Sequence, residues 1–215
     1  MQKFIVTLMI SFFSITLYAQ THLYENPNFD EISKNHHVIA IMPFKTTVSL
    51  RPKQMKNIKP EQLNRMEKSE GESVQSAMYS WFLKRQKRGK LRVQVQDIST
   101  TNALLKRHNI TYENMDEKTP AEIAKVLGVD AVISGKFETS KPMSEGASVA
   151  LGLLVGFWGR TNKATMNLFI HNGVDGQLLI NYNKGVSGSI GSSTDDLVNI
   201  LMRKASRRVS YAKDK

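Results

Sequence analysis

The sequence predicts a single α/β domain of three-layer-like form, with a central mixed sheet of about five strands and helices packed on it. Two segments carry this prediction. Residues Val38–Phe44 read Val-Ile-Ala-Ile-Met-Pro-Phe, and residues Ala131–Ile133 follow a short helical pattern. Both segments are apolar on two sides, which is typical of central strands that helices cover. We therefore expect these two strands to lie side by side in the middle of the sheet.

The helix before the second strand has both of its ends marked. Thr119 and Glu122 have the spacing of a capping box, and Pro120 stands at the first helical position. Gly128 can adopt the left-handed conformation that ends a helix. The pattern predicts a helix that runs directly into a buried strand.

Other helices and strands alternate along the chain. Apolar residues at spacings of three and four predict a helix over about 60–87, in which Gly71 is either a break or the true start. Alternating polarity predicts a strand over 91–96, and a helix over about 99–107 can be capped by its first or second residue. The basic connection 45–59 contains a proline, and we expect no regular element there.

The last part of the chain predicts a hairpin and a final helix. Strands over 164–171 and 178–182 flank a turn at 172–176 that contains two glycines. Residues 185–193 are rich in Gly and Ser and are expected to be flexible. Residues 194–211 then predict a helix with acidic residues at its start and basic residues toward its end.

The two marked segments also carry a family resemblance. A strand that ends in Pro43-Phe44, followed by a unit of helix, Leu-Gly-Val-Asp-Ala (127–131), strand and Gly135, resembles the periplasmic α/β domain of several bacterial envelope proteins. These include the curli secretion-channel subunit CsgG, the penicillin-binding-protein activator LpoB and the N-terminal domain of TolB. The resemblance covers roughly 38–211. It implies an envelope protein that acts by binding another component.

The N-terminus predicts export. A short positive start precedes the apolar run Phe4–Leu17, and Ala19 offers a small residue for cleavage of a signal peptide. A membrane anchor is the alternative, but the run is shorter than the roughly 20 residues that a spanning helix needs. The chain has no cysteine. It therefore lacks the lipid-modified cysteine of CsgG and LpoB, and any tether must work differently.

These observations divide the chain into four parts, one of which contains an insertion. The expected parts are a signal peptide (1–19), a flexible N-terminal arm (20–36), an α/β envelope domain (37–211) with a Gly-rich apolar insertion (144–160), and a C-terminal tail (212–215).

The composition limits the possible partners. The formal net charge is +11, and cleavage after Ala19 would remove Lys3 and leave +10. A cytosolic chain of this charge would suggest nucleic acid, but the predicted export makes that partner unexpected. We expect an acidic envelope protein, anionic lipid or the outer-membrane surface instead, and a homo-oligomer is possible.

An almost charge-free run over 147–159 is one candidate contact. Its length is close to the roughly 9–11 residues of a membrane β-strand. In the CsgG resemblance a membrane-inserting hairpin arises at this position, although the second insertion of that family is missing here. The alternative is a loop or strand that folds over the domain's own core. The residues that would touch a membrane or another subunit are Val149, Leu151, Leu153, Leu154, Val155, Phe157 and Trp158.

Two basic groups are the other candidate contact. Each lies near the end of a predicted helix, where cations also stabilise the helix dipole and improve solubility. A solvated face is therefore one interpretation, and binding to anionic headgroups is the other. The residues are Lys84, Arg85, Lys87 and Arg88, and then Arg203, Lys204, Arg207 and Arg208.

The search for catalytic or metal-binding motifs gives no specific pattern. The histidines lack metal-site spacing, the Gly/Ser-rich segment 185–193 has neither a nucleophile elbow nor a phosphate loop, and Asp195 and Asp196 are explained as helix N-terminal acids. We therefore predict no enzyme, no cofactor and no metal site. A hydrolase with an unrecognised site is an alternative that would require groups such as His171, Asp175 and Asp195 to converge.

The overall prediction is an exported, non-catalytic assembly, scaffold or regulatory binding module of the CsgG/LpoB-like type, in the periplasm or at the outer-membrane periphery of a Gram-negative bacterium. The first alternative is a membrane-associated oligomer or secretion-channel-like subunit that uses the 147–159 run.

Overall fold

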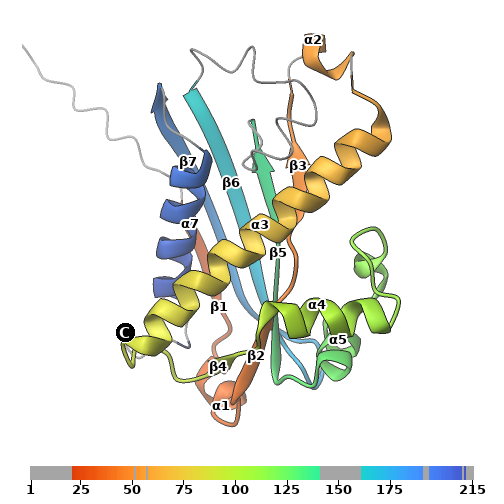
Figure 1. Ribbon diagram of the computed structural model, residues 1–215. Helices are drawn as coiled ribbons and strands as arrows, with labels where there is room; N and C mark the ends of the chain where they lie inside the picture. Colours follow the sequence, from red (N-terminus) through yellow and green to blue (C-terminus); the bar gives the residue numbers. More distant parts are fainter. Residues whose placement is uncertain are drawn as a thin grey trace, which may run out of the picture.

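The computed structural model describes residues 21–50, 52–56, 58–140, 161–190, 194–209 and 211. It has the predicted α/β architecture, with one mixed sheet and helices packed on it (Figure 1). The strands are β1 (Thr21–Glu25), β2 (Val38–Ile41), β3 (Lys45–Val48), β4 (Gln94–Val95), β5 (Ala131–Thr139), β6 (Thr161–Asn172) and β7 (Leu178–Ile190). The helices are α1 (Phe29–Ser33), α2 (Pro52–Met55), α3 (Pro60–Lys87), α4 (Ile98–Arg107), η1 (Met115–Glu117), α5 (Pro120–Leu127) and α7 (Thr194–Arg208).

The sheet has the order β1-β7-β6-β5-β2-β4, and β3 also pairs with β5. β2 and β5 lie side by side and parallel, with Ala40 opposite Val132 and Ile41 opposite Ile133. This confirms the central expectation from the sequence. The sheet has seven strands where about five were expected, because β1 and β3 formed in segments that the sequence analysis left without regular structure.

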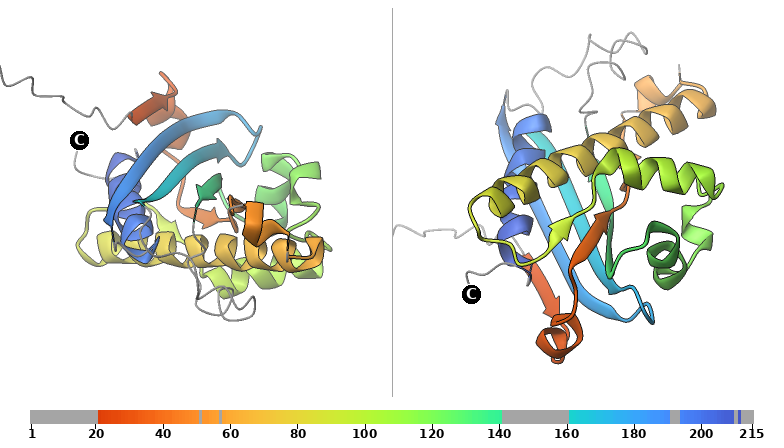
Figure 2. Two further views of the ribbon diagram at one scale, coloured as in Figure 1. Left: turned by 90° about the horizontal axis from the view of Figure 1, so that it is seen from above. Right: turned by 60° about the horizontal axis from the view of Figure 1, so that its bottom comes forward.

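The helices form unequal layers on the two faces of the sheet. α3 and α7 lie on one face, whereas α5 lies on the other (Figure 2). The larger core lies under α3 and α7 and includes Met78, Phe82 and Leu201 packed on β5, β6 and β7. The smaller core lies between β2, β5, α4 and α5. One face of the sheet is therefore covered more extensively than the other.

A break between β2 and β3 brings α3 close to the sheet. Both strands pair with β5 along the same side, and Met42, Pro43 and Phe44 separate them. A Cβ on Gly71 would lie 2.0 Å from the carbonyl oxygen of Phe44, and a Cβ on Gly135 would lie 2.3 Å from the Phe44 ring. The two glycines thus leave the space that Phe44 fills. α3 runs without a break through Gly71, so its role is close approach and not the division of the helix.

The predicted helix before β5 is confirmed with its caps. The Thr119 hydroxyl accepts from the backbone N–H of Glu122, and the Glu122 carboxylate accepts from the backbone N–H of Thr119 at 2.8 Å. Gly128 has φ +65° and ψ +43°, the left-handed conformation that was expected. These local signals fix the direction in which the chain enters β5.

The prediction of a flexible arm over residues 20–36 is wrong for the residues that the structure describes. β1 pairs antiparallel with β7, with Leu23 opposite Tyr182. α1 then buries Phe29, whose ring packs edge-on against Tyr211 at a centroid distance of 5.2 Å. The segment looks polar in sequence because an edge strand exposes most of its side chains, so only tertiary pairing reveals it.

Other boundaries also differ from the predictions. The connection 45–59 contains β3 and α2, and Pro52 begins α2 because the first helical position tolerates proline. β7 continues into the Gly/Ser-rich segment as far as Ile190, paired with β6. α4 begins one residue earlier than expected, because the Asp97 carboxylate and not a hydroxyl accepts from the N–H groups of its first turn. β4 is only two residues long, and α7 ends at Arg208.

A polar network links Tyr211 to His36 and to the turn between β6 and β7. The Asn172 amide donates to Asp175 Oδ1 at 2.8 Å, which leaves its Oδ1 to accept from His36 Nε2 at 3.2 Å. His36 Nδ1 is then the acceptor for the Tyr211 hydroxyl. Burial raises the pKa of Tyr211, and the neighbouring Arg92 guanidinium only partly opposes this rise. Burial lowers the pKa of His36 and so favours its neutral form, and the hydrogen bond to Asn172 only partly opposes this.

Three predicted segments lie outside the described residues, namely the signal peptide (1–19), the apolar insertion (144–160) with its run 147–159, and the C-terminal tail (212–215). Among the helices that the structure describes, none combines the length and the apolar character required to cross a bilayer.

Candidate functional site

The two predicted basic groups come together at one corner of the molecule. The C-terminal ends of α3 and α7 lie next to each other, beside the end of the chain (Figure 1). The indole N–H of Trp81 on α3 donates to Asn199 Oδ1 on α7 at 3.2 Å. Beyond the helices, the backbone N–H of Arg92 donates to the Tyr211 carbonyl at 3.1 Å. Residues that lie more than a hundred positions apart in the sequence thus form one surface.

Most of the predicted cations are exposed on this surface. The exposed residues are Lys84, Lys87, Arg88, Arg203, Lys204, Arg207 and Arg208, which we call the basic corner. The exception is Arg85, which is only 8% exposed and whose guanidinium donates to the Lys90 carbonyl at 3.4 Å. Arg85 therefore holds the turn after α3 and is not available at the surface.

Within the described ranges, the cations of the basic corner form no ion pair. Among the described residues, none of its seven cations has a carboxylate within 4 Å. The Lys84 ammonium lies 4.6 Å from the centroid of the Trp81 ring, which is the one aromatic contact found for these cations in the described part. The dipoles of the two helix C-termini account for part of this clustering. They do not account for seven cations without a paired carboxylate.

Lys184 extends the corner beneath the surface, and the sequence analysis missed it. It lies on the α7 side of β7, is 5% exposed, and donates to the Thr21 hydroxyl. Burial lowers the pKa of Lys184, and the nearby Lys204 and Arg208 lower it further. The signal was present in the sequence, because Lys184 follows Ile180 and Tyr182 at the inward positions of a strand.

The groups proposed for a hydrolase do not converge. His171 lies at the end of β6, and Asp175 accepts from the backbone N–H of Gln177 in the turn that follows. Asp195 is the second residue of α7, which starts at the opposite end of β7 (Figure 1). The arrangement therefore removes the reason for proposing this catalytic set. No cluster of three or more His, Asp or Glu side chains suited to a metal ion occurs in the part of the chain that the structure describes.

A pocket of about 410 Å³ lies on the other side of the molecule, beside the break between β2 and β3. Its position follows from the topology. After β2 the chain passes through α3 to β4, which lies on one side of β2 in the sheet. From β4 it passes through α4 and α5 to β5, which lies on the other side of β2. Such a switch at the carboxyl end of a parallel strand is where open α/β sheets bind ligands. We call it the switch pocket.

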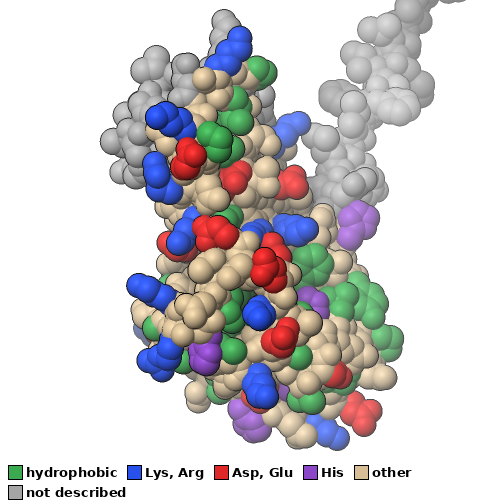
Figure 3. All heavy atoms as spheres, turned by 90° about the vertical axis from the view of Figure 1, so that its right-hand side faces the viewer, with side chains coloured by type: hydrophobic (Ala, Val, Ile, Leu, Met, Phe, Trp, Pro, Cys, Tyr) green, Lys and Arg blue, Asp and Glu red, His purple; other side chains and the backbone are tan. Residues whose placement is uncertain are grey.

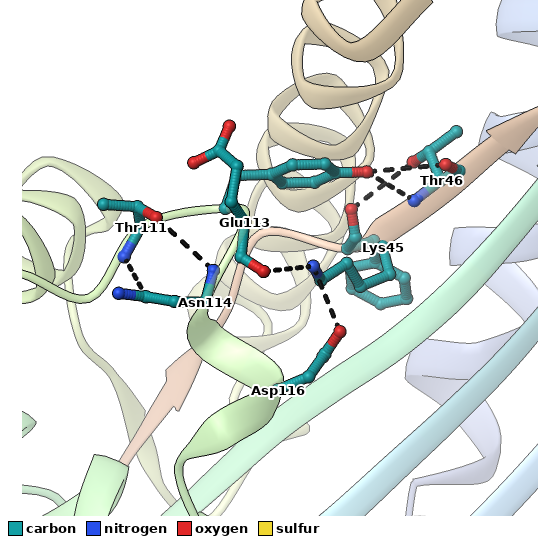
Figure 4. Close-up of polar contacts among 8 residues, drawn as sticks. Lys45, Thr46, Thr111, Glu113, Asn114 and Asp116 are labelled. Atoms are coloured by element: carbon teal, nitrogen blue, oxygen red, sulfur yellow. Dashed lines mark hydrogen bonds and ion pairs between the residues drawn. The ribbon is translucent and has the colours of Figure 1, made fainter.

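Polar contacts fix one wall of the switch pocket (Figure 4). The Lys45 ammonium lies 3.0 Å from Asp116 Oδ2 and donates to the Glu113 carbonyl at 3.4 Å. The Tyr112 hydroxyl accepts from the backbone N–H of Thr46 at 2.8 Å, and burial raises the pKa of this hydroxyl. The connection between α4 and α5 is thereby held against β3. Its lysine is already paired, unlike the cations of the basic corner.

Comparisons with solved structures find similar folds at low identity. The PelC dodecamer from Paraburkholderia phytofirmans is 8% identical with a TM-score of 0.42, and the match covers 86% of this chain and 92% of that one. Lipoprotein GNA1162 from Neisseria meningitidis is 12% identical with a TM-score of 0.40, over 80% and 99% of the two chains. The LpoB C-terminal domain from Salmonella enterica is 9% identical with a TM-score of 0.34, over 74% and 93%.

No protein-family model and no curated protein sequence matches the chain. The structural neighbours include the LpoB domain to which the sequence resemblance pointed. At these identities and TM-scores they carry no argument about function, which is therefore argued from the geometry of this chain.

Proposed function

We propose that the protein is an exported, non-catalytic binding module that associates with the anionic surface of the bacterial envelope through the basic corner. The observation that carries the proposal is the convergence of two helix C-termini with seven exposed cations and no paired carboxylate in the described part. The predicted signal peptide supplies the compartment in which such a surface is met. An envelope protein held at this surface would be its assembly or regulatory partner.

Charge arithmetic supports a surface and not a single small anion. A Lys or Arg close to an anionic membrane contributes about 1 kcal/mol of attraction, which decays within a Debye length. The seven cations lie on two helices and the turn after α3, so they are spread out and do not surround one point. Lys184 is crowded by Lys204 and Arg208, and a nearby layer of negative charge would relieve that repulsion.

Binding to vesicles tests the proposal. The mature chain should sediment with phosphatidylglycerol vesicles and not with phosphatidylcholine vesicles at about 0.1 M salt, where the Debye length is about 10 Å. At about 1 M salt that length falls to about 3 Å, and binding should be lost. Binding that is indifferent to salt, or equal for both lipids, would contradict the proposal.

The chain provides a matched control for the charge. Arg207→Gln with Arg208→Gln neutralises two adjacent cations in the last turn of α7. Lys106→Gln with Arg107→Gln does the same in the last turn of α4, away from the corner. At about 1 kcal/mol per cation, the first pair should weaken vesicle binding roughly 10- to 30-fold and the second should leave it nearly unchanged. Equal losses would show that only total charge matters.

The membrane-inserting alternative depends on residues 147–159 and stays a prediction. It would be supported by ring-shaped, detergent-dependent oligomers of the mature chain. A soluble monomer after purification would count against it.

A further inference from the structure

A row of amide side chains lies on the face of the sheet opposite α3 and α7. Directly paired residues of antiparallel strands point to the same face. The register therefore places Asn181 beside Phe169 and Tyr24, and Asn183 beside Asn167. We call Asn167, Phe169, His171, Asn181, Asn183 and Tyr24 the amide strip. His171 belongs to it because it lies two positions after Phe169 on β6. Four strands, β5, β6, β7 and β1, contribute to this part of the sheet.

Among the described elements, no helix covers the amide strip. α5 lies over β2 and β5 and also contacts β6, whereas β7 is open on this side (Figure 2, left). Alternate residues of β6 show the contrast, because Met166, Leu168 and Ile170 are fully buried under α7 while Asn167 and Phe169 are half-buried. Tyr24 is 47% exposed. The strip is therefore accessible to a ligand.

Three polar atoms of the strip are buried without a partner in the described part of the chain. They are Asn167 Oδ1, Asn181 Oδ1 and His171 Nδ1. Buried polar atoms are paired in the large majority of cases, and an exception calls for a reason. Burial also lowers the pKa of His171, so this ring is neutral and can accept a hydrogen bond. The side-chain amides can both donate and accept.

The strip continues into the switch pocket. Phe169 belongs to both, and Ser134 and Lys136 of β5 line the pocket beside it. Register places Ser134 opposite Phe169 and Lys136 opposite Asn167. The pocket floor is apolar, with Met42, Ile123 and Val132 among its residues, and its volume of about 410 Å³ falls in the range of small-ligand sites. Strip and pocket form one continuous site.

Three lysines (Lys45, Lys118 and Lys136) and one aspartate (Asp116) line the switch pocket, so its positive excess is small beside that of the basic corner. Lys45 is paired with Asp116 at 3.0 Å. Lys136 and Glu138 alternate with inward residues of β5 and so share the open face. Figure 3 shows positive and negative side chains interspersed on the side of the molecule that carries α4 and α5. The site thus differs from the basic corner, and it selects a ligand by hydrogen bonds and shape.

We propose that the amide strip and the switch pocket bind a neutral glycan chain. Sugar hydroxyls can accept from the amide N–H₂ groups, and rotation of an amide about its last side-chain bond would turn its unpaired oxygen toward an adjacent hydroxyl. The C–H faces of a sugar ring suit the electron-rich faces of Phe169 and Tyr24. An apolar pocket next to the strip takes a sugar or its acyl substituent. An anionic polymer is disfavoured, because the site has no excess of unpaired cations comparable with the basic corner.

Affinity electrophoresis of the mature chain in native gels tests this proposal. The gels would contain one soluble neutral polysaccharide each, namely dextran, glucomannan, galactomannan or fully N-acetylated glycol chitin, which has no free amine to carry charge. We expect at least one polymer to retard the chain at both about 0.1 M and about 1 M salt, because this site does not depend on charge.

Substitutions distinguish a binding role from a structural one. Asn181→Leu and Asn167→Leu remove an unpaired buried amide at similar volume, so thermal stability should be unchanged or higher. The same changes should weaken retardation roughly tenfold or more, because each removes hydrogen bonds made in a desolvated site. Asn199→Leu, on α7 and on the opposite side of the sheet, is the control for position: it breaks the hydrogen bond from Trp81 and should still leave retardation unchanged.

Three results would overturn the proposal. The first is no retardation by any of the four polymers. The second is a loss of stability in the Asn181→Leu and Asn167→Leu variants equal to the loss of binding, which would make the amides structural. The third is self-association that these variants abolish while retardation stays constant, which would assign the strip to a second copy of the chain. Vesicle binding is measured separately, so failure here leaves the basic corner untouched.

Discussion

The basic corner and the amide strip lie on opposite sides of one sheet and differ in almost every physical property. The corner consists of exposed cations without paired carboxylates in the described part. The strip consists of half-buried amides and rings whose positions the strand register fixes. Charge spread over helix ends suits a large anionic surface, and fixed hydrogen-bonding groups suit an ordered ligand. The fold thus separates long-range attraction from short-range recognition.

The same difference appears in the packing beneath the two surfaces. Under α3 and α7, the inward residues of β6 are completely buried hydrophobics. On the other face, the outward residues of β6 leave polar atoms without partners among the residues that the structure describes. Stability therefore comes mainly from the helix-covered face, and the open face has more freedom to bind. The following predictions test this division, beginning with the largest effect.

Substitution of Gly71 should disturb both regions at once. A Cβ at this position would lie 2.0 Å from the Phe44 carbonyl oxygen, so Gly71→Ala must push α3 away from the sheet. We expect a loss of more than about 3 kcal/mol in the free energy of unfolding, measured with urea.

Gly89→Ala is the control for this change. Gly89 has φ +66° and no atom within 4 Å of the added Cβ, so only the left-handed backbone strain of about 1–2 kcal/mol is expected. If Gly71→Ala cost no more than Gly89→Ala, the close approach of α3 would not be a constraint on the fold.

Neighbouring residues of β6 should respond in opposite ways. Leu168→Ala opens a cavity under α7 and should cost about 2–5 kcal/mol. Asn167→Leu, one residue earlier and on the open face, should be neutral or stabilising by up to about 1 kcal/mol, because it removes an unpaired buried amide. Thermal and urea unfolding measure both. Comparable destabilisation by the two changes would contradict the difference between the faces.

The smallest effect that we expect is a dependence of stability on acid pH. Burial lowers the pKa of His36 below its ordinary value of 6.5, and the hydrogen bond to Asn172 and the charge of Asp130 only partly oppose this, while Arg92 and His37 add to it. The folded state therefore binds fewer protons than the unfolded chain. The contribution of His36 to the free energy of unfolding is fully present above about pH 6.5. It is lost as the pH falls through the pKa that His36 has in the folded protein.

Urea unfolding between pH 7.5 and pH 5 measures this effect. His171, on the amide strip, has a pKa lowered by burial and should act in the same direction. His36→Gln should reduce the slope of stability against pH, and His171→Gln should reduce it separately. A slope that neither substitution changes would show that the two imidazoles are not held neutral by the fold.

The helices and strands that were predicted correctly are those whose own residues carry a local signal. Two-sided apolar runs identified β2 and β5 and their adjacency, and the capping box with Gly128 identified α5 to the residue. The last helix and the long helix α3 followed from apolar spacing. Each of these features is written within a few residues of the element that it defines.

The features that were missed depend on distant partners. β1 is polar in sequence and forms because β7 offers an edge to it. β3 follows a proline and forms because β5 extends beyond β2. Lys184 lies beside the basic corner because α7 packs over β7 and brings Lys204 and Arg208 close to it. The unpaired atoms of Asn167 and Asn181 could not be foreseen, since burial of a single atom depends on the packed neighbours and not on the sequence pattern.

Hydrogen exchange of the mature chain, free and bound to phosphatidylglycerol vesicles, tests the central claim most directly. If the basic corner meets the anionic surface, exchange should slow at the C-terminal ends of α3 and α7, and β6 and β7 should exchange as in the free chain. Protection concentrated on β6 and β7, with the helix ends unchanged, would contradict the assignment of the two surfaces.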